Sequence, residues 1–320
     1  MPLTRVTTSV VKKQGSGDYG CSQVGLGECS FRVEARGKLR GTMKTLRSSL
    51  LLLGGGIALV SPLTALAREA PPAPAALVSF TEPESIKRLE RSKHKVDFFH
   101  LANQFESQTN KAFCGPATAA IVLNALRVDN AAIAKPLDPT LFGEKDRALL
   151  PAGVEPLFPR YTQNNFFDEA SSQVKSREQV FGKPRAEGEK RDGGIQLRQL
   201  HGMLAAKGLD VRLRVADGTL PDATIKAELK ENLKTANDYV IINYARPVLG
   251  QKGGGHISPL GAYDQASDSF LVLDVNPNGQ QWVWAKADAL LQAMRTPDSV
   301  ENRGYLLVKE GPAAQASDTK

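Results

Sequence analysis

Cys114 and the residues that follow it form the stretch best suited to nucleophilic chemistry. The thiol ends a polar loop, and Gly115 and Pro116 suit a turn and the first positions of a helix. Residues 117–126 are nearly all Ala, Ile, Val and Leu, which predicts a helix buried on most sides. The dipole and free N–H groups at its start stabilise a thiolate, the nucleophilic form of cysteine. Cys114 is therefore predicted to be a nucleophile, and a small buried hydrophobe is the alternative.

A thiol nucleophile needs a base, and histidine most often takes that part. His256 directly follows three glycines, 253–255, and opens a predicted strand. The glycines let the backbone approach another element closely and place the ring at a sheet edge. We expect the other histidines beyond residue 67 to be structural or solvated: His94, His100 and His201.

Asp274 and Gln108 complete the polar groups that such a site uses. Asp274 lies in the next predicted strand, where a cross-strand neighbour about 5 Å away is within reach of His256. An acid in an apolar run is costly unless it is partnered, although an aspartate that caps a turn remains an alternative. Gln108 precedes Cys114 in the polar loop, and its amide is a candidate donor to an oxyanion. Gln104 is nearby, so spacing alone does not decide that role.

The order of the predicted elements indicates an α+β fold, because helices come first and a mostly antiparallel sheet second. Region 127–194 contains many prolines and is predicted to form surface loops and short helices, or a lid. Predicted helices cover residues 84–95, 117–126, 196–207, 221–236 and 286–294. Predicted strands cover residues 209–215, 239–244, 256–263, 269–275 and 304–308.

Residues 43–67 have the parts of a secretory signal peptide. Lys44 and Arg47 precede a short apolar run, and Ala65-Leu66-Ala67 fits a cleavage site. An uncleaved anchor is the alternative, but the run is short against the ~20 residues that a membrane span needs. We therefore predict a periplasmic or secreted protein without stable membrane association after cleavage. The predicted boundaries are a mis-called or disordered leader at 1–42, the signal at 43–67, a Pro/Ala linker at 68–85, a catalytic domain at 86–310 and a polar tail at 311–320.

The formal net charge of +7 lies mostly before residue 68. After cleavage the balance is nearly neutral, which argues against nucleic acid and membrane surfaces as partners. Cys21 and Cys29 also precede the cleavage site, so Cys114 has no partner for a disulfide within the exported chain.

Four segments, in order, resemble phytochelatin synthases, most closely the short bacterial members sometimes called primitive. The resemblance covers roughly residues 90–310 and implies a papain-like cysteine peptidase fold, with a nucleophile helix packed on the sheet. It implies Cys114 as nucleophile, His256 as base, Asp274 as the group that orients the imidazole and Gln108 as oxyanion donor. The resembling segments are Gln108–Leu126, Gly254–Tyr263, Phe270–Val275 and Arg303–Val308.

The substrate implied by the resemblance is glutathione, cleaved at its Cys–Gly bond through a γ-glutamylcysteinyl thioester. Water would give γ-glutamylcysteine, and a second glutathione would give phytochelatin, the product used in heavy-metal detoxification. Arg246 and Arg303 match family arginines near the site and are predicted to bind substrate carboxylates. A surface arginine at a strand end is the alternative for each.

The sequence also departs from the family pattern. The loop 276–281 lacks the usual cations and tyrosine, which favours water as acceptor, and we expect phytochelatin synthesis to be weak or absent. The region 164–194 is longer than usual. We expect no tightly bound cofactor and no dedicated metal site; Cd or Zn would enter as the metal–glutathione thiolate. A homodimer is one expectation for the assembly. The alternative functions are a cysteine peptidase for another small peptide and a non-catalytic relative that binds thiols or metals.

Overall fold

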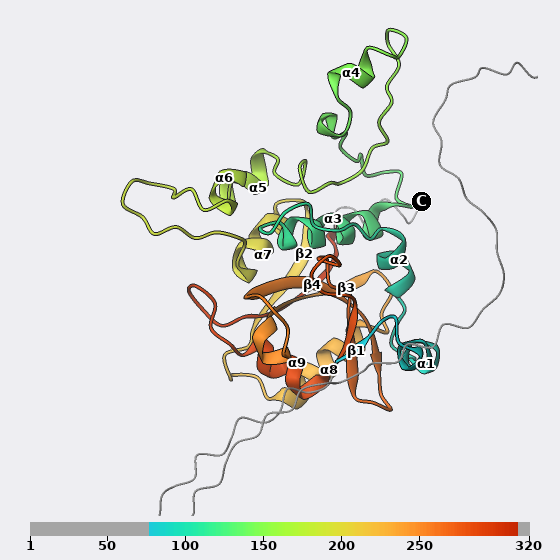
Figure 1. Ribbon diagram of the computed structural model, residues 1–320, viewed down its shortest axis with the longest axis vertical. Coiled ribbons are helices and arrows are strands. Elements are labelled where there is room, and N and C mark those ends of the chain that lie inside the picture. The colour runs from blue at the N-terminus through green and yellow to red at the C-terminus, as the bar shows by residue number, and fades with distance from the viewer. Residues whose placement is uncertain (1–76, 313–320) are drawn as a thin grey trace, which may run out of the picture. The chain divides into compact units, whose positions relative to one another are not determined.

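An antiparallel sheet organises residues 77–312, the part of the chain that this computed structural model describes (Figure 1). Its strand order is β1-β6-β5-β4-β3-β7-β2, so the strands richest in site residues, β3 and β4, lie near its middle. The strands are β1 Val78–Ser79, β2 Leu209–Val215, β3 Asp238–Ala245, β4 Gly255–Asp264, β5 Ser269–Val272, β6 Val283–Lys286 and β7 Gly304–Glu310.

Helices cover both faces of this sheet, and the alternation of β3 shows why (Figure 1). Tyr239 and Ile241 join the core beneath α3 and α7, whereas Val240 and Ile242 join the core beneath α8 and α9. A strand buried on both faces reads as a continuous apolar run, as β3 does. The helices that contact the sheet include α1 Pro83–Arg91, α2 Phe98–Asn103, α3 Cys114–Arg127, α7 Leu197–Ala205, α8 Asp222–Asn232 and α9 Ala287–Met294.

The α+β class and each of the longer predicted elements are confirmed within a few residues at their ends. One end matters for the site: β5 stops at Val272, so Asp274 lies beyond the strand that was predicted to hold it. A register shift between Leu260 and Ala262 of β4 also interrupts the regular pairing of β4 with β5 close to this end of β5. The direct cross-strand pairing predicted for Asp274 is therefore wrong. The leader at 1–42, the signal at 43–67, residues 68–76 of the linker and residues 313–320 of the tail lie outside the described residues. The described half of the predicted linker contains β1, which pairs with β6, and the start of α1.

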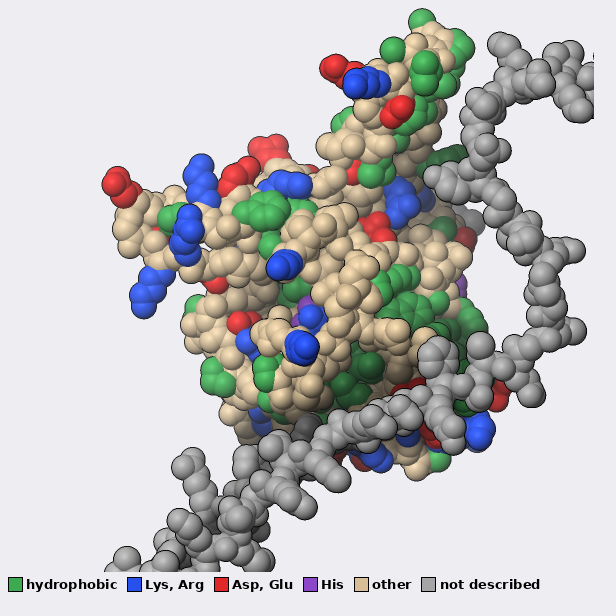
Figure 2. All heavy atoms as spheres, viewed as in Figure 1, with side chains coloured by type: hydrophobic (Ala, Val, Ile, Leu, Met, Phe, Trp, Pro, Cys, Tyr) green, Lys and Arg blue, Asp and Glu red, His purple; other side chains and the backbone are tan. Residues whose placement is uncertain are grey.

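Region 127–194 consists of loops and short helices, as predicted, and part of it stands away from the sheet around α4 (Figure 1). Hydrophobic side chains remain exposed along it, among them Leu149 at 82% and Phe158 at 85% (Figure 2). Within residues 77–312, no helix is both long and apolar enough to cross a membrane. The short helices are η1 Pro139–Leu141, α4 Glu144–Arg147, α5 Glu169–Val174 and α6 Arg177–Val180, and η2 Arg246–Leu249 follows β3.

The residues at the start of α3 explain why the helix can begin at Cys114. The first N–H groups of a helix have no intrahelical partner, so Pro116 in the first turn sacrifices no hydrogen bond. A side chain at Gly115 would come within 3.2 Å of Ile195, so the glycine permits close packing there. Thr118 donates a hydrogen bond to the carbonyl of Ile257 on β4, which fixes the helix against the strand that carries His256.

Asp97, just before α2, is a buried acid outside the site. Its Oδ1 accepts the N–H of Asn237, while its Oδ2 is buried without a hydrogen-bond partner. Burial raises the pKa of Asp97 to about 7, and the nearby charge of Asp238 acts in the same direction. Between the ordinary pKa of an aspartate and a pH of about 7, Asp97 is therefore protonated in the folded state but ionised in the unfolded chain.

We predict that the wild type becomes less stable as pH rises from about 4 to about 7, and that Asp97→Asn abolishes this decrease. The raised pKa makes folding favour the protonated acid, so stability falls over that interval by up to about 1.4 kcal/mol for each pH unit. Asparagine keeps the acceptor for Asn237 and carries no charge. Melting temperatures at pH 5 and pH 8 test this, with the exposed Asp129→Asn as control. An equal effect of Asp97→Asn at both pH values would contradict the prediction.

Candidate active site

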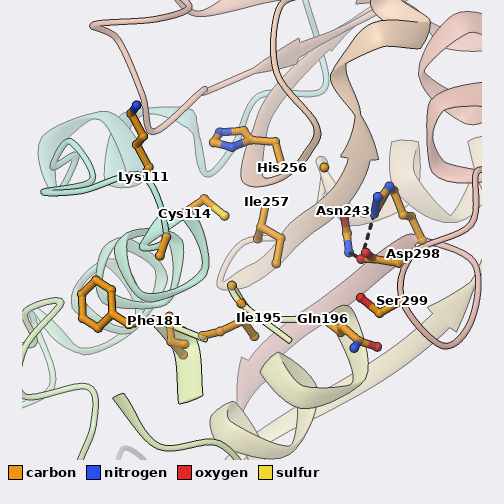
Figure 3. A pocket seen from close by; sticks show the side chains of 16 residues that line it. Lys111, Cys114, Phe181, Ile195, Gln196, Asn243, His256, Ile257, Asp298 and Ser299 are labelled. Carbon is orange, nitrogen blue, oxygen red and sulfur yellow. Dashed lines mark hydrogen bonds and ion pairs between the residues drawn. The ribbon is translucent and has the colours of Figure 1, made fainter. Parts of the chain in front are cut away.

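A cavity of about 440 Å³ lies between the start of α3, β4 and the residues before β7. Its lining divides into two kinds of surface, with Cys114 and His256 between them (Figure 3). The apolar part includes Ala112, Val180, Phe181 and Ile195. The polar part includes Asn243, Asp298, Ser299 and Arg303. A pocket of this size suits a small ligand with both apolar and charged groups.

Cys114 is the first residue of α3 and is partly buried. Burial raises the pKa of its thiol, but the hydrogen bond and charge of His256 oppose this effect, as do the N–H groups of Ile257 and Gly115. The net pKa lies below the ordinary value of a thiol. The structure thus surrounds the sulfur with the groups that stabilise a thiolate.

His256 lies on β4 directly opposite Tyr244 of β3, and the two rings meet edge to face with centroids 5.8 Å apart. Its Nε2 is 2.9 Å from Oδ1 of Asp274, although the ring N–H does not point at that oxygen well enough to form an aligned hydrogen bond. Burial lowers the pKa of His256, whereas its interactions with Asp274 and Cys114 raise it, and the net direction is upward. The ring therefore retains its proton more readily than a free imidazole.

Asp274 has no exposed surface and holds four different groups. Nη2 of Arg246 contacts both carboxylate oxygens at 2.7 and 2.6 Å, the hydroxyl of Tyr244 donates at 3.1 Å and the N–H of Asn276 donates at 2.8 Å. His256 is the fourth partner. Burial raises the pKa of Asp274, but His256 and Arg246 outweigh it, and the net pKa lies below the ordinary value. The turn-capping alternative is also correct here, because one carboxylate serves both the ring and the turn.

Arg246 differs from its predicted place beside a substrate. It begins η2, is only 7% exposed and does not line the cavity. Its carboxylate partner is Asp274. A charge-paired arginine in this position is suited to orient the acid, and the substrate-binding role of Arg246 stays a prediction.

Arg303 does line the cavity, as its predicted role requires. Its Nη1 is 2.8 Å from Asp298, and Nδ2 of Asn243 donates to the same carboxylate at 2.9 Å. The Nε of Arg303 is buried without a partner. A side chain at Gly255 would come within 2.8 Å of this guanidinium, so the last of the three glycines leaves the space that Arg303 occupies.

Gln108 is not among the residues that line the cavity. Its Nε2 donates to the carbonyl of Asn110 at 2.7 Å, and its Oε1 is buried without a partner. Its backbone N–H donates to the carbonyl of Val275, which joins the loop before Cys114 to the segment that carries Asp274. The oxyanion role of Gln108 stays a prediction.

Several residues of the site escaped the sequence analysis, namely Lys111, Phe181, Asn243, Tyr244 and Asp298. Tyr244 ends a continuous apolar run, where nothing in the pattern distinguishes it from core. A polar residue within that same run, Asn243, was a usable signal, because a buried amide needs partners. Residues 77–312 contain no group of three or more His, Cys, Asp or Glu side chains placed to hold a metal ion.

Comparison with known families identifies the chain. The model of the phytochelatin synthase family matches residues 69–140 and 150–305. The chain belongs to this family. The unmatched residues 141–149 include α4, on the segment that stands away from the sheet (Figure 1).

Curated relatives in this family carry the name glutathione gamma-glutamylcysteinyltransferase. Protein 1 of Triticum aestivum is 28% identical over 68% of this chain and 37% of its own length, and protein 3 of Lotus japonicus is 25% identical over 77% and 44%. The relative from Schizosaccharomyces pombe is 23% identical over 67% and 43%. The matched part of this chain thus spans less than half the length of these relatives.

A solved structure, the peptidase domain of Streptococcus ComA, covers 64% of this chain and 96% of that domain. It has 12% sequence identity and a TM-score of 0.33. At this TM-score the likeness does not establish how the helices and strands of this chain are arranged.

We predict that His256→Ala shifts the pH midpoint of Cys114 alkylation upward. In the wild type the thiol's pKa is lowered against the effect of burial, mainly by His256, so removing the ring leaves burial dominant. The rate of reaction with iodoacetamide between pH 5 and pH 10 measures the shift. His201→Ala serves as control, since the ring of His201 hydrogen-bonds to the carbonyl of Val211 and does not line the cavity. Unchanged midpoints in both variants would contradict the arrangement.

We predict that Arg246→Met lowers the free energy of unfolding by roughly 3–5 kcal/mol, because it leaves the buried Asp274 charge without its cation. Urea unfolding measures this loss. Arg198→Met is the matched control, since that arginine pairs with Glu301 at the exposed surface and should contribute no more than about 1 kcal/mol. Equal losses for the two variants would show that the buried pair has no special weight.

Proposed function

We propose that this chain is a cysteine acyltransferase that cleaves the Cys–Gly bond of glutathione. One observation carries the proposal: a thiol with a lowered pKa, an imidazole and a fully buried carboxylate form one continuous chain of interactions at a cavity. Membership of the phytochelatin synthase family and relatives named for this transfer support the choice of substrate. A papain-like arrangement, with the nucleophile helix against a sheet that bears the base, is part of the proposal.

In the proposed reaction the Cys114 thiolate attacks the carbonyl carbon of the Cys–Gly amide. The Asp274 contact engages Nε2 of His256, which leaves Nδ1 as the ring nitrogen for the reacting groups. The imidazolium gives its proton to the glycine nitrogen as the C–N bond breaks, and a γ-glutamylcysteinyl thioester remains on sulfur. Neutral His256 then takes a proton from water as the water attacks the thioester. The C–S bond breaks, γ-glutamylcysteine leaves and the Cys114 thiolate is restored.

The oxyanion of each tetrahedral intermediate needs donors fixed before the reaction. We assign this role to the N–H of Cys114, which lies in the unpaired first turn of α3, together with the Gln108 amide. One N–H of Gln108 is engaged by Asn110, so the second must serve the oxyanion.

The polar part of the cavity suits the γ-glutamyl end of glutathione. That end carries an α-carboxylate and an α-ammonium on the same carbon. Arg303 offers a cation for the first, and Asp298 beside it offers an anion for the second. Arg303 thus keeps the substrate-binding role that the sequence predicted, now with a named carboxylate neighbour.

Hydrolysis is the proposed main outcome, and transfer to a second glutathione is weak or absent. The loop 276–281 brings no basic side chain or tyrosine to the site. Cadmium or zinc enters the proposal only as the metal thiolate of the substrate. We place the reaction in the periplasm or outside the cell, because the predicted signal at 43–67 would export the chain; a homodimer remains one expectation.

An alternative substrate, another small peptide, is favoured by one feature. The ring of Phe181 lines the cavity and is 56% exposed, so it could accept an apolar residue that glutathione lacks. A panel that compares glutathione with short apolar peptides separates these two activities.

We predict that the purified protein converts glutathione to glycine and γ-glutamylcysteine, and that Cys114→Ser lowers the rate by at least about a hundredfold. Mass analysis of products with and without cadmium measures both hydrolysis and transfer. Products with two or more γ-glutamylcysteine units would contradict the proposed preference for water. Cleavage retained by Cys114→Ser would contradict the mechanism, and a thiol no more reactive than a model thiol would favour a non-catalytic relative.

A further inference from the structure

Lys111 is a second cation at the cavity. It lies on the opposite side of Cys114 from Asp298, the carboxylate partner of Arg303. Figure 3 shows Lys111 beside Cys114, with Asn243 and Asp298 across the cavity. Arg303 is already paired with Asp298. The ammonium of Lys111 makes no ion pair or hydrogen bond with any residue in the range 77–312. Among the described residues, it is therefore the cation of this lining that has no carboxylate partner.

The backbone at Lys111 is fixed by a tight turn. The carbonyl of Asn110 accepts the N–H of Phe113 at 3.3 Å and Nε2 of Gln108 at 2.7 Å. The Oδ1 of Asn110 accepts the N–H of Ala112 at 3.0 Å. These bonds hold the backbone of Lys111 three residues before the nucleophile, while its exposed side chain is free to reorient. A flexible stem on a fixed turn suits a group that meets a ligand carboxylate.

The direction of the proposed substrate places its two carboxylates at opposite ends. If Arg303 and Asp298 hold the γ-glutamyl end and the scissile carbonyl meets Cys114, the leaving amine must point away from Arg303. That amine belongs to glycine, whose carboxylate is one carbon from the nitrogen. We propose that Lys111 binds this carboxylate and so selects an α-amino acid as the leaving group. The inference rests on the proposed function and adds a specificity-determining residue to it.

The same contact serves the reverse step. An incoming amine attacks the thioester carbonyl, the C–S bond breaks, the amine proton passes to His256 and the thiolate of Cys114 is restored. By microscopic reversibility, the acceptor amine occupies the position that the glycine amine left. Every free α-amino acid presents the same arrangement of amine and carboxylate, including the α-amine of a second glutathione. Lys111 therefore binds the acceptor carboxylate in any transfer that competes with water.

The test compares glutathione with its C-terminal amide, which lacks only the glycine carboxylate charge. Lys111→Gln should lower kcat/KM for glutathione by about tenfold, as the loss of one charge-assisted contact implies. The same variant should change kcat/KM for the amide by less than about twofold. Lys111→Arg should restore most of the activity on glutathione. Lys87→Gln, which removes an equal charge from exposed α1, should leave both substrates unaffected.

A second measurement follows exchange of isotope-labelled glycine into glutathione. Lys111→Gln should slow this exchange at least as much as it slows cleavage, because the incoming glycine needs the same contact. Equal losses on glutathione and its amide, or no loss on either, would overturn the role of Lys111 alone. Absence of cleavage by the wild type would overturn the proposed function and this inference with it.

Discussion

The fully buried carboxylate of Asp274 is the constraint on which the rest of the site depends. An unpaired charge without solvent contact costs several kcal/mol, so the fold must bring cations and donors to it. They come from three neighbouring pieces of the sheet region: Tyr244 from β3, Arg246 from η2 and His256 from β4. Satisfying this one group thus fixes the relative positions of the elements that form one side of the cavity.

Charges alternate outward from this centre. The guanidinium of Arg246 neutralises Asp274, Asp274 raises the pKa of His256, and His256 lowers the pKa of Cys114. Helix α3 meets this series with its first residue, because small side chains and a proline allow its start to pack against β4. The cavity beside these four residues offers surfaces for a ligand: a polar wall that carries opposite charges and an apolar wall.

The sequence predicts the elements and the principal reacting groups, because each leaves a local signal. The apolar run after Cys114 indicates the helix, and the glycines before His256 indicate a close approach that Gly255 does make to Arg303. The pairing of Arg246 with Asp274 leaves no such signal. It depends on η2 and the residues after β5 lying side by side, which only the folded chain brings about. The cross-strand position of Asp274 failed for a related reason: β5 ends at Val272, two residues before Asp274, and the pattern of apolar residues does not show where the pairing of a strand stops.

The central claim is that Cys114 carries an acyl group during turnover, and trapping that group tests it most directly. The protein is mixed with glutathione, quenched in acid within the first turnovers and weighed intact by mass spectrometry. The account predicts a mass increase of one γ-glutamylcysteinyl group, located on the peptide that contains Cys114 and removed by hydroxylamine. Turnover of glutathione with no such adduct at any quench time, under conditions where thioester hydrolysis limits the rate, would contradict it.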